Sequence, residues 1–339
     1  MLNRIAQLPE IWFTAAIAAL VVLLSIGLGL PISLPSGERA AFVGIHYLYP
    51  LLGVGLWSLF AFFGLRQRLA STFMVALPCY AIVLVCHFNL KLWLPHINPV
   101  LWDGLYWNID QALRPLVVAC FELRRWIAPA IPLDSNFYMA GFIVMFYVSF
   151  SYHALRTPQA FRPLFLAALI FQGLGALAYM LAPALGPFLY EQGVEALQTR
   201  AQAGMLQAYR ENVAGGSAWL SENGSANIAV GLAAMPSLHT GGSFLFLLFA
   251  WRHGRPLVPA YSLLFGFIAI DAVANRWHYL VDLPAGIALA LFSAWLADRM
   301  SRDALTSELG ARIPSGSPIP RRPAFAFRRI GRSGGLRVN

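Results

Sequence analysis

Two short polar segments near the end of the chain combine the residue types that phosphoryl transfer requires. The first reads Pro236-Ser237-Leu238-His239, and the second places His278 four residues before Asp282. The residues between the two histidines, 240–277, are enough for two membrane crossings of about 17 to 20 residues each. The chain then returns to the side it left, so we expect both histidines at one membrane face.

His278 is the candidate nucleophile. If the helix that follows it is regular from its first turn, Asp282 lies on the same face as His278. A carboxylate there accepts a hydrogen bond from one ring nitrogen and leaves the other nitrogen basic. Taken alone, the two residues have a simpler explanation as an interfacial pair that anchors a helix end.

His239 and Ser237 are the candidates for handling the leaving group and the phosphate. Pro236-Ser237 ahead of an apolar run is typical of a helix start, and the free amides of a first turn bind anions. Ser237 is therefore a predicted phosphate-binding residue. His239, in the same turn, is the predicted general acid for the leaving oxygen. A capped helix with an incidental histidine is the alternative.

Arg276 is the candidate for charge stabilisation, two residues before His278 in a predicted exterior turn. A planar guanidinium suits phosphoryl oxygens, so Arg276 is also a predicted phosphate-binding residue. The alternative is that its side chain reaches lipid phosphate outside any site.

Other polar residues lie near the outer ends of predicted spans. His87 and Lys91 are four residues apart on one span, and Asp271 is on another. Polar groups at such positions raise the question of a functional role, although Lys91 could instead extend to the membrane surface. Asp103 and Asp110 are predicted to be interfacial loop residues.

The composition indicates a polytopic membrane protein. Hydrophobic residues make up 58% of the 339 residues, charged residues make up 12%, and the mean hydropathy is +0.62. These values exclude an ordinary soluble domain, and we predict an all-α integral membrane helical bundle of about eight transmembrane helices. The predicted spans are Ile11–Leu30, Tyr49–Leu65, Thr72–Leu92, Asn136–His153, Phe161–Ala182, Ser237–Trp251, Val258–Ala274 and Tyr279–Leu296.

The basic residues predict the orientation. Three short loops on one side contain arginines and no acid, which places both termini in the cytoplasm and the histidine pair on the exterior face. These loop arginines are Arg66, Arg68, Arg156, Arg162, Arg252 and Arg255. Compact loops and the arginine bias favour a bacterial inner membrane, with a periplasmic exterior. Much of the net charge of +9 lies after Asp298, so we do not expect nucleic acid as a partner.

We predict one transmembrane domain over residues 1–298 and a disordered, arginine-rich cytoplasmic tail over residues 299–339. On the exterior side, Leu113–Trp126 mixes apolar and charged residues at helical spacing, which predicts an interfacial helix, with a ninth span as the alternative. The exterior loop Pro183–Pro236 is predicted to carry a short helix around Val194–Tyr209.

The two polar segments resemble motifs of the type 2 phosphatidic acid phosphatase superfamily. Its Pro-Ser-x-His motif matches Pro236-Ser237-Leu238-His239, and its histidine four residues before an aspartate matches His278 and Asp282. The resemblance implies that His278 becomes a phosphohistidine, that Asp282 orients it and that His239 assists the leaving group. It covers Phe161–Asp298 and implies a six-helix phosphatase-like core.

The chain departs from the phosphatase branch of that superfamily. Ala272 stands where this branch has an arginine six residues before its nucleophile, and the first motif, a lysine followed by six residues and then Arg-Pro, is not found. Arg156 to Arg162-Pro163 has too short a spacing and a predicted cytoplasmic position. With His-Tyr-x-x-Asp in the third motif, the chain looks more like the inositol phosphorylceramide synthase branch, the inositolphosphotransferases.

The residues and the resemblance together predict a lipid phosphotransferase that moves a phospho-headgroup from a phospholipid to a hydroxyl-bearing lipid or polyol acceptor. The alternative is a lipid phosphate phosphatase, because the two activities differ only in whether water reaches the intermediate. A non-catalytic transporter or lipid scaffold predicts polar residues through the depth of several spans. No cofactor and no metal are expected, because Arg276 and helix amides can supply the charge stabilisation.

Overall fold

The computed structural model describes residues 8–36 and 68–310, and in these ranges the regular structure is helical. The α-helices are α2 (Pro9–Leu28), α4 (Arg68–Leu92), α5 (Leu94–Ile97), α6 (Asp103–Ala112), α7 (Arg114–Ile127), α8 (Phe137–Arg156), α9 (Pro158–Leu181), α10 (Ala196–Asn223), α11 (Leu238–His253), α12 (Val258–Ala274) and α13 (Asp282–Gly310). Three short 3-10 helices, η1 (Pro187–Leu189), η2 (Ile228–Val230) and η3 (Arg255–Leu257), lie in the connections.

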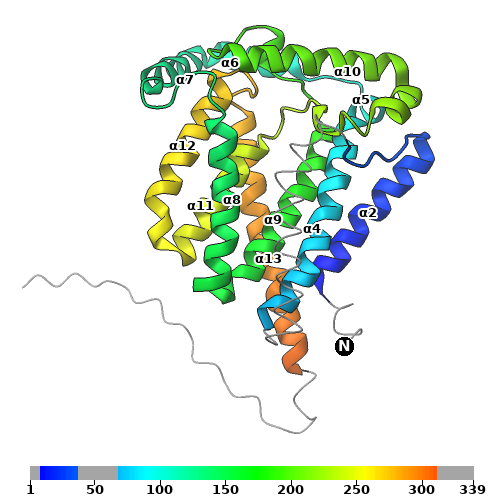
Figure 1. Cartoon of the computed structure of the whole chain (residues 1–339), viewed down its shortest axis with the longest axis vertical. Helices are drawn as coiled ribbons and strands as arrows, with labels where there is room; N and C mark the ends of the chain where they lie inside the picture. The colour runs from blue at the N-terminus through cyan, green and yellow to red at the C-terminus, as the bar shows by residue number, and fades with distance from the viewer. Residues whose placement is uncertain (1–7, 37–67, 311–339) are drawn as a thin grey trace, which may run out of the picture.

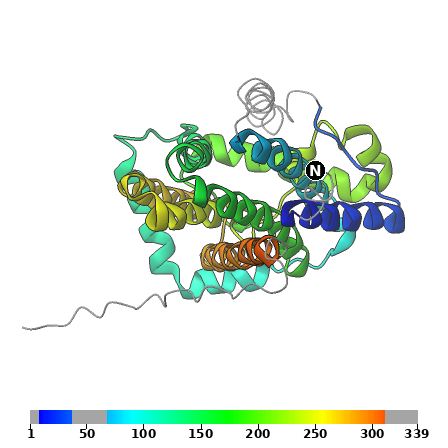
Figure 2. The same cartoon turned by 90° about the horizontal axis from the view of Figure 1, so that it is seen from below.

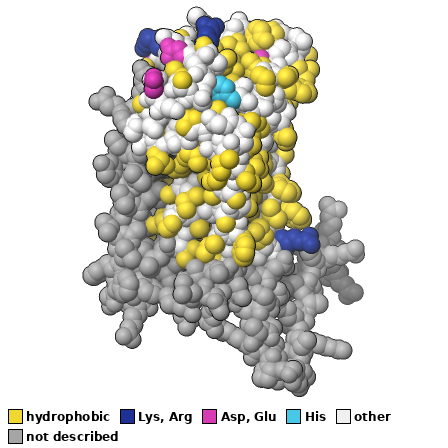
Figure 3. Space-filling view, turned by 90° about the vertical axis from the view of Figure 1, so that its right-hand side faces the viewer, with side chains coloured by type: hydrophobic (Ala, Val, Ile, Leu, Met, Phe, Trp, Pro, Cys, Tyr) yellow, Lys and Arg dark blue, Asp and Glu magenta, His cyan; other side chains and the backbone are white. Residues whose placement is uncertain are grey.

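Six of the described helices are long and apolar enough to cross a membrane, which confirms the predicted polytopic helical bundle. These lie in α2, α4, α8, α9, α12 and α13. Helix α11, with 16 residues, is shorter but runs through the same bundle (Figure 1). The predicted span Tyr49–Leu65 lies outside the described residues. Figure 3 shows a broad apolar belt on one face, with charged side chains gathered mainly at one end.

Helix α9 is the central helix of the bundle, and α2 is peripheral. In α9, 67% of the most apolar window is buried inside the protein, whereas in α2 the figure is 17%. The view along the bundle in Figure 2 shows α2 at one side, next to α4. The main core packs side chains of α4, α8, α11 and α13 around α9.

A layer of helices lies across one end of the bundle, formed by α6, α7 and α10 (Figure 1). Helix α7 occupies the segment predicted as an interfacial helix, and its 14 residues are too few for a ninth span. Its inner face packs Val117 and Phe121 against Val273 and Ala274 at the end of α12. Helix α10 extends much further than the short helix predicted there.

Two predictions differ from the structure: where the last helix ends, and where Asp103 and Asp110 lie. Helix α13 continues past Asp298 to Gly310, beyond the predicted start of the tail, and residues 311–339 lie outside the described ranges. Asp103 and Asp110 are not loop residues, because both lie in α6 with side chains buried against the end of the bundle. Their burial follows from their partners, which are described below.

Candidate active site

A close crossing of α11 and α13 brings the two polar segments together. Gly241 and Gly286 meet at the crossing, and a Cβ atom on either one would collide with the backbone of the other helix. The amide of Ser237 also donates to the carbonyl oxygen of Asp282 at 3.0 Å. Small residues allow this approach of backbones within the membrane. The start of α11 is therefore fixed against the start of α13.

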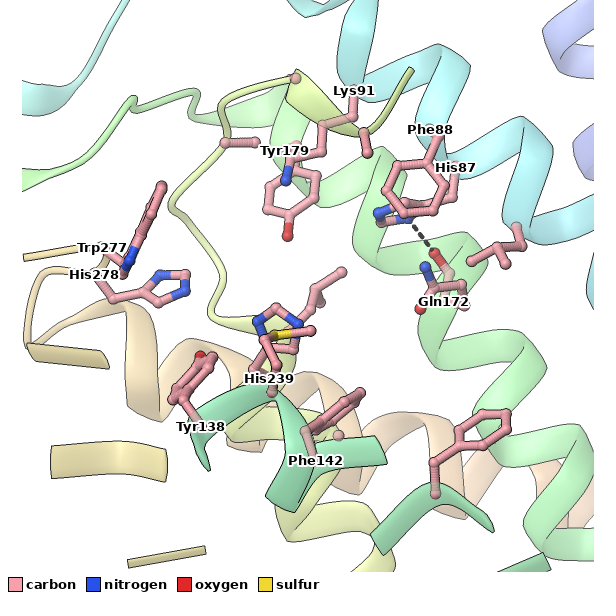
Figure 4. A pocket seen from close by; sticks show the side chains of 18 of the residues that line it. His87, Phe88, Lys91, Tyr138, Phe142, Gln172, Tyr179, His239, Trp277 and His278 are labelled. Carbon is pink, nitrogen blue, oxygen red and sulfur yellow. Dashed lines mark hydrogen bonds between the residues drawn. The ribbon is translucent and has the colours of Figure 1, made fainter. Parts of the chain in front are cut away.

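The imidazole of His278 is held through one nitrogen. Its Nδ1 lies 2.8 Å from the carbonyl oxygen of Ala234 and 3.3 Å from Oδ2 of Asp282. Both oxygens are acceptors, so Nδ1 carries the proton and Nε2 keeps its lone pair. His278 lines a cavity, and Figure 4 shows its ring pointing into that space. A neutral imidazole in this tautomer is suited to nucleophilic attack by Nε2.

Asp282 is fully buried and is the first residue of α13. The predicted geometry, with His278 and Asp282 on one face of a helix, is wrong, because His278 lies in the turn before α13. The contact forms instead because Oδ2 of Asp282 also accepts the amide of Tyr279 at 2.8 Å. This bond folds the turn back over the helix start and sets the imidazole beside the carboxylate.

His239 lies in the first turn of α11, as predicted, and lines the same cavity as His278. Its ring packs edge-on against Tyr138 and Phe142 of α8, with centroids 5.3 and 4.9 Å away. Ser237 is the N-cap residue of α11 but is fully buried and does not line the cavity. Its hydroxyl donates to the hydroxyl of Thr240 at 3.0 Å.

Arg276 lies behind the cavity wall. Its guanidinium is fully buried, with Nη2 3.0 Å from Asp110 and Nε 3.4 Å from Glu191. It also stacks over Trp107, 5.5 Å from the ring centroid, and it does not line the cavity. Burial lowers the pKa of Arg276, and the two carboxylates oppose this effect. The positive charge of Arg276 is therefore already paired with carboxylates of the protein itself.

Asp110 joins the two ends of the turn that carries His278. One carboxylate oxygen pairs with Arg276, and the other accepts the amide of Leu280 at 2.9 Å. Burial raises the pKa of Asp110, and the bonds to Leu280 and Arg276 act in the opposite direction. Arg276 has a φ of 57°, an uncommon backbone conformation for a residue with a side chain. The ion pair holds the turn in this conformation.

Asp103, seven residues earlier on α6, binds the same region. Its carboxylate accepts the hydroxyl of Tyr279 at 2.8 Å and the amides of Leu185 and Gly186 at 2.9 Å each. Two helical turns separate Asp103 from Asp110, so both side chains leave one face of α6. The prediction of loop residues gave Asp103 and Asp110 no role at the site, and the seven-residue spacing of the two acids is the sequence signal for a shared helix face.

The cavity beside the histidines has a volume of about 470 Å³ and runs between α4, α8, α9, α10 and α11. Its deeper part is lined by apolar and aromatic side chains such as Leu84, Phe146 and Phe246. Near its other end, Lys91 is the one Lys or Arg side chain among the described lining residues, and no acid lines it. Lys91 lies over the ring of Tyr179, 5.6 Å from its centroid. The structure thus adds Lys91 to His239 and His278 as a candidate site residue.

Lys91 also has a sequence signal that was overlooked. Six residues separate Lys91 from Asn98-Pro99. The first motif of the type 2 phosphatidic acid phosphatase superfamily has the same spacing between its lysine and Arg-Pro, so Asn98 stands in place of the arginine. Asn98 donates to the carbonyl oxygen of Met180 at 2.8 Å and does not line the cavity. A search for the exact motif, which ends in Arg-Pro, therefore does not find Lys91.

The partners of Asp271 indicate a structural role. It forms a buried ion pair with Arg124 of α7, 2.7 Å from Nε, and it accepts a bond from Asn275. Arg124 also pairs with Glu195, so this cluster ties the end layer to α12. Asp271 does not line the cavity. Within the described ranges, no group of three or more His, Cys, Asp and Glu side chains is arranged to hold a metal ion.

These features define a polytopic membrane protein whose apolar cavity ends in histidines and a lysine. The family model of the PAP2 superfamily, the type 2 phosphatidic acid phosphatases, matches residues 107–296, and the chain belongs to this superfamily. It is therefore a phosphatase-like membrane enzyme that acts on phosphorylated lipids. Searches of curated proteins and of solved structures found no match.

Proposed function

We propose that this enzyme is a lipid phosphotransferase of the inositol phosphorylceramide synthase-like branch. It moves a phospho-headgroup from a phosphodiester lipid to the hydroxyl group of an acceptor, through a phosphohistidine on His278. The basic short loops support a site on the exterior, periplasmic face of a bacterial inner membrane, with cytoplasmic termini.

The charge of the cavity supports a phosphodiester donor. A phosphomonoester carries about 1.5 to 2 negative charges at pH 7, whereas a phosphodiester carries one. Lys91 is the one Lys or Arg among the described lining residues, and Arg276 is already paired with Asp110 and Glu191. Excess negative charge in a low-dielectric cavity is costly. Lys91 alone offsets the single charge of a diester, which leaves the proton of His239 for the leaving oxygen, whereas a monoester would engage both positive charges. This match favours transfer over the phosphatase alternative.

The first step is cleavage of the donor. Nε2 of His278 attacks phosphorus, the bond from phosphorus to the diacylglycerol oxygen breaks, and protonated His239 gives its proton to that oxygen. Asp282 stabilises the positive charge that develops on the imidazole of His278, and Lys91 stabilises the phosphoryl oxygens. The apolar part of the cavity accommodates acyl chains.

The second step regenerates the enzyme. An acceptor hydroxyl gives its proton to His239 and attacks phosphorus, so that a new phosphorus–oxygen bond forms and the bond to His278 breaks. If water enters instead, the product is the free phosphorylated headgroup. Helix α10 lies against the cavity through Gln198 and Met205, and Gln198 accepts a hydrogen bond from Trp277 at 2.9 Å. This cover limits the access of water.

The experiment compares two donors with the same acyl chains, phosphatidylglycerol and phosphatidic acid, on the purified full chain in detergent. Each is incubated with and without a long-chain alcohol, and new lipids, free headgroup phosphate and inorganic phosphate are followed. We expect turnover of the diester with a new lipid only when the alcohol is present. We expect His278→Asn to lose this turnover.

The matched control is His253→Asn, since His253 lies at the other end of the helix that carries His239. It should behave as the unsubstituted protein does. Release of inorganic phosphate from phosphatidic acid, with no acceptor product, would identify a phosphatase. Equal turnover by the unsubstituted protein and His278→Asn would exclude His278 as the nucleophile, and no turnover of either donor by the unsubstituted protein would favour a transporter or scaffold.

A further inference from the structure

A third histidine faces the cavity from the side opposite His278. His87 of α4 is 4% exposed, and Figure 4 shows it across the cavity from His278, with His239 between them. The cleavage and transfer steps described above make no use of it. Burying an imidazole in a membrane-spanning helix is costly unless its polar atoms are satisfied. One of its two nitrogens has a protein partner, and the other faces the cavity.

The partner of His87 fixes its hydrogen-bonding character. Nδ1 lies 3.0 Å from the carbonyl oxygen of Gln172, so Nδ1 carries the proton and donates it. Nε2 therefore has a lone pair, and no donor to it is present among the described residues. A ligand that satisfies Nε2 must offer a hydrogen-bond donor, such as a hydroxyl group.

Neighbouring groups restrict that donor to an uncharged one. Lys91 lies one helical turn beyond His87, and the ring of Tyr179 contacts both, 5.8 Å from the ring of His87 and 5.6 Å from Nζ of Lys91. An ammonium group beside His87 would be repelled by Lys91 in this low-dielectric environment. The position of His87 away from His278 also separates this donor from the reacting hydroxyl.

We propose that His87 forms an anchoring subsite for a second hydroxyl group of the acceptor. The acceptor is then a neutral lipid with at least two hydroxyl groups, one bound by Nε2 of His87 and the other reacting at His239 and His278. This inference rests on the proposed transferase function and names its acceptor class.

The experiment compares acceptors of one chain length: hexadecan-1-ol, hexadecane-1,2-diol, hexadecane-1,3-diol and 2-aminohexadecan-1-ol. Phosphatidylglycerol is the donor for the purified full chain, and kcat/KM is measured for each acceptor. We expect at least one diol to exceed the simple alcohol by about tenfold, the effect of one buried hydrogen bond. The amino alcohol should show no such advantage.

Substitution of His87 then tests the anchor. In His87→Leu the ratio of diol to alcohol should fall to about one, and in His87→Gln, whose side-chain oxygen is an acceptor, part of the ratio should return. His253→Leu, at the other end of the bundle, should keep the ratio of the unsubstituted protein. An unchanged ratio in His87→Leu, or an equal loss with diol and alcohol, would overturn the inference.

Direct binding separates this inference from the proposed function. Binding of the preferred diol is measured by calorimetry in His278→Asn, with and without His87→Leu. If the unsubstituted protein only hydrolyses its donor but diol binding still depends on His87, the transferase proposal fails and the subsite stands. If transfer occurs and diol binding ignores His87, the subsite fails and the transferase proposal stands.

Discussion

The two sides of the cavity are built differently. The turn that carries His278 is fixed by buried carboxylates, with Asp110 binding Arg276 and the amide of Leu280. On the other side, His87 makes one hydrogen bond to a carbonyl oxygen and Lys91 lies over an aromatic ring, with no ion pair among the described residues. On the His278 side, the charged groups are paired with one another inside the protein. On the His87 side, the polar groups are available to a ligand.

This difference fits the roles proposed for the two sides. A nucleophile must be held within a fraction of an ångström of its attacking position, which requires several bonds to rigid elements. Groups that bind variable parts of a substrate keep hydrogen-bonding atoms and charges unpaired for the ligand. The comparison predicts that substitutions on the first side act on turnover and stability, whereas those on the second act on substrate binding and selectivity.

The largest effect is expected for Asp282→Asn. An amide retains the size of the side chain but no longer favours the Nδ1-protonated tautomer or the imidazolium, as seen for relay aspartates in general. We expect kcat to fall about 10²- to 10⁴-fold with little change in KM, measured with the phosphodiester donor. Asp298→Asn, on the exposed part of the same helix, is the control, and a similar loss there would contradict a specific role for Asp282.

Asp110→Asn should give the next largest effect, because it leaves the buried guanidinium of Arg276 with Glu191 alone. Breaking a buried pair costs about 3 to 5 kcal/mol. We expect a clear fall in the thermal unfolding temperature in detergent. Adding Arg276→Met removes the unpaired charge and should recover part of the loss. No recovery in the double variant would mean that the ion pair is not what Asp110 contributes.

Lys91→Met should raise the KM for the phosphodiester donor by about 10- to 100-fold, the value of a hydrogen bond to a charged group. Lys91 is the one lysine in the sequence, so acetylation offers a second measurement. Acetylation should inactivate the enzyme, the donor lipid should protect it, and Lys91→Arg should resist. Unchanged KM in Lys91→Met would remove Lys91 from the site.

The smallest effect is expected at the edge of the fixed side, where Arg114 forms two hydrogen bonds with Glu191. Arg114 lowers the pKa of Glu191 from its ordinary value of 4.5. Because the folded pKa is the lower one, the stabilisation is complete above pH 4.5 and is lost as the pH falls through the folded pKa. We expect Glu191→Gln to cost about 1 kcal/mol at pH 7, since the pair is partly exposed.

That difference should shrink as the pH falls below 4.5 and should be lost once Glu191 is protonated in the folded protein, as measured by unfolding at a series of pH values. A difference between the unsubstituted protein and Glu191→Gln that is independent of pH would mean that packing, and not charge, connects Glu191 to the turn.

The class of fold and the positions of His239 and His278 at one cavity could be predicted because both depend on local pattern. Apolar runs of fixed length predict spans, and two crossings return the chain to one face. The position of Arg276 behind the cavity could not be predicted. Its choice between phosphate and Asp110 depends on α6, which is 166 residues away in the sequence.

The sequence by itself determined the helical membrane bundle, the histidine segments and their common membrane face, because hydrophobic length and short motifs are local properties. The tertiary structure alone decided which cation faces the cavity, that Asp103 and Asp110 hold the His278 turn, and that His87 faces the same space. These outcomes depend on which helices pack together. Because an unpaired buried charge is costly, each buried charge pairs with the group that packing places beside it.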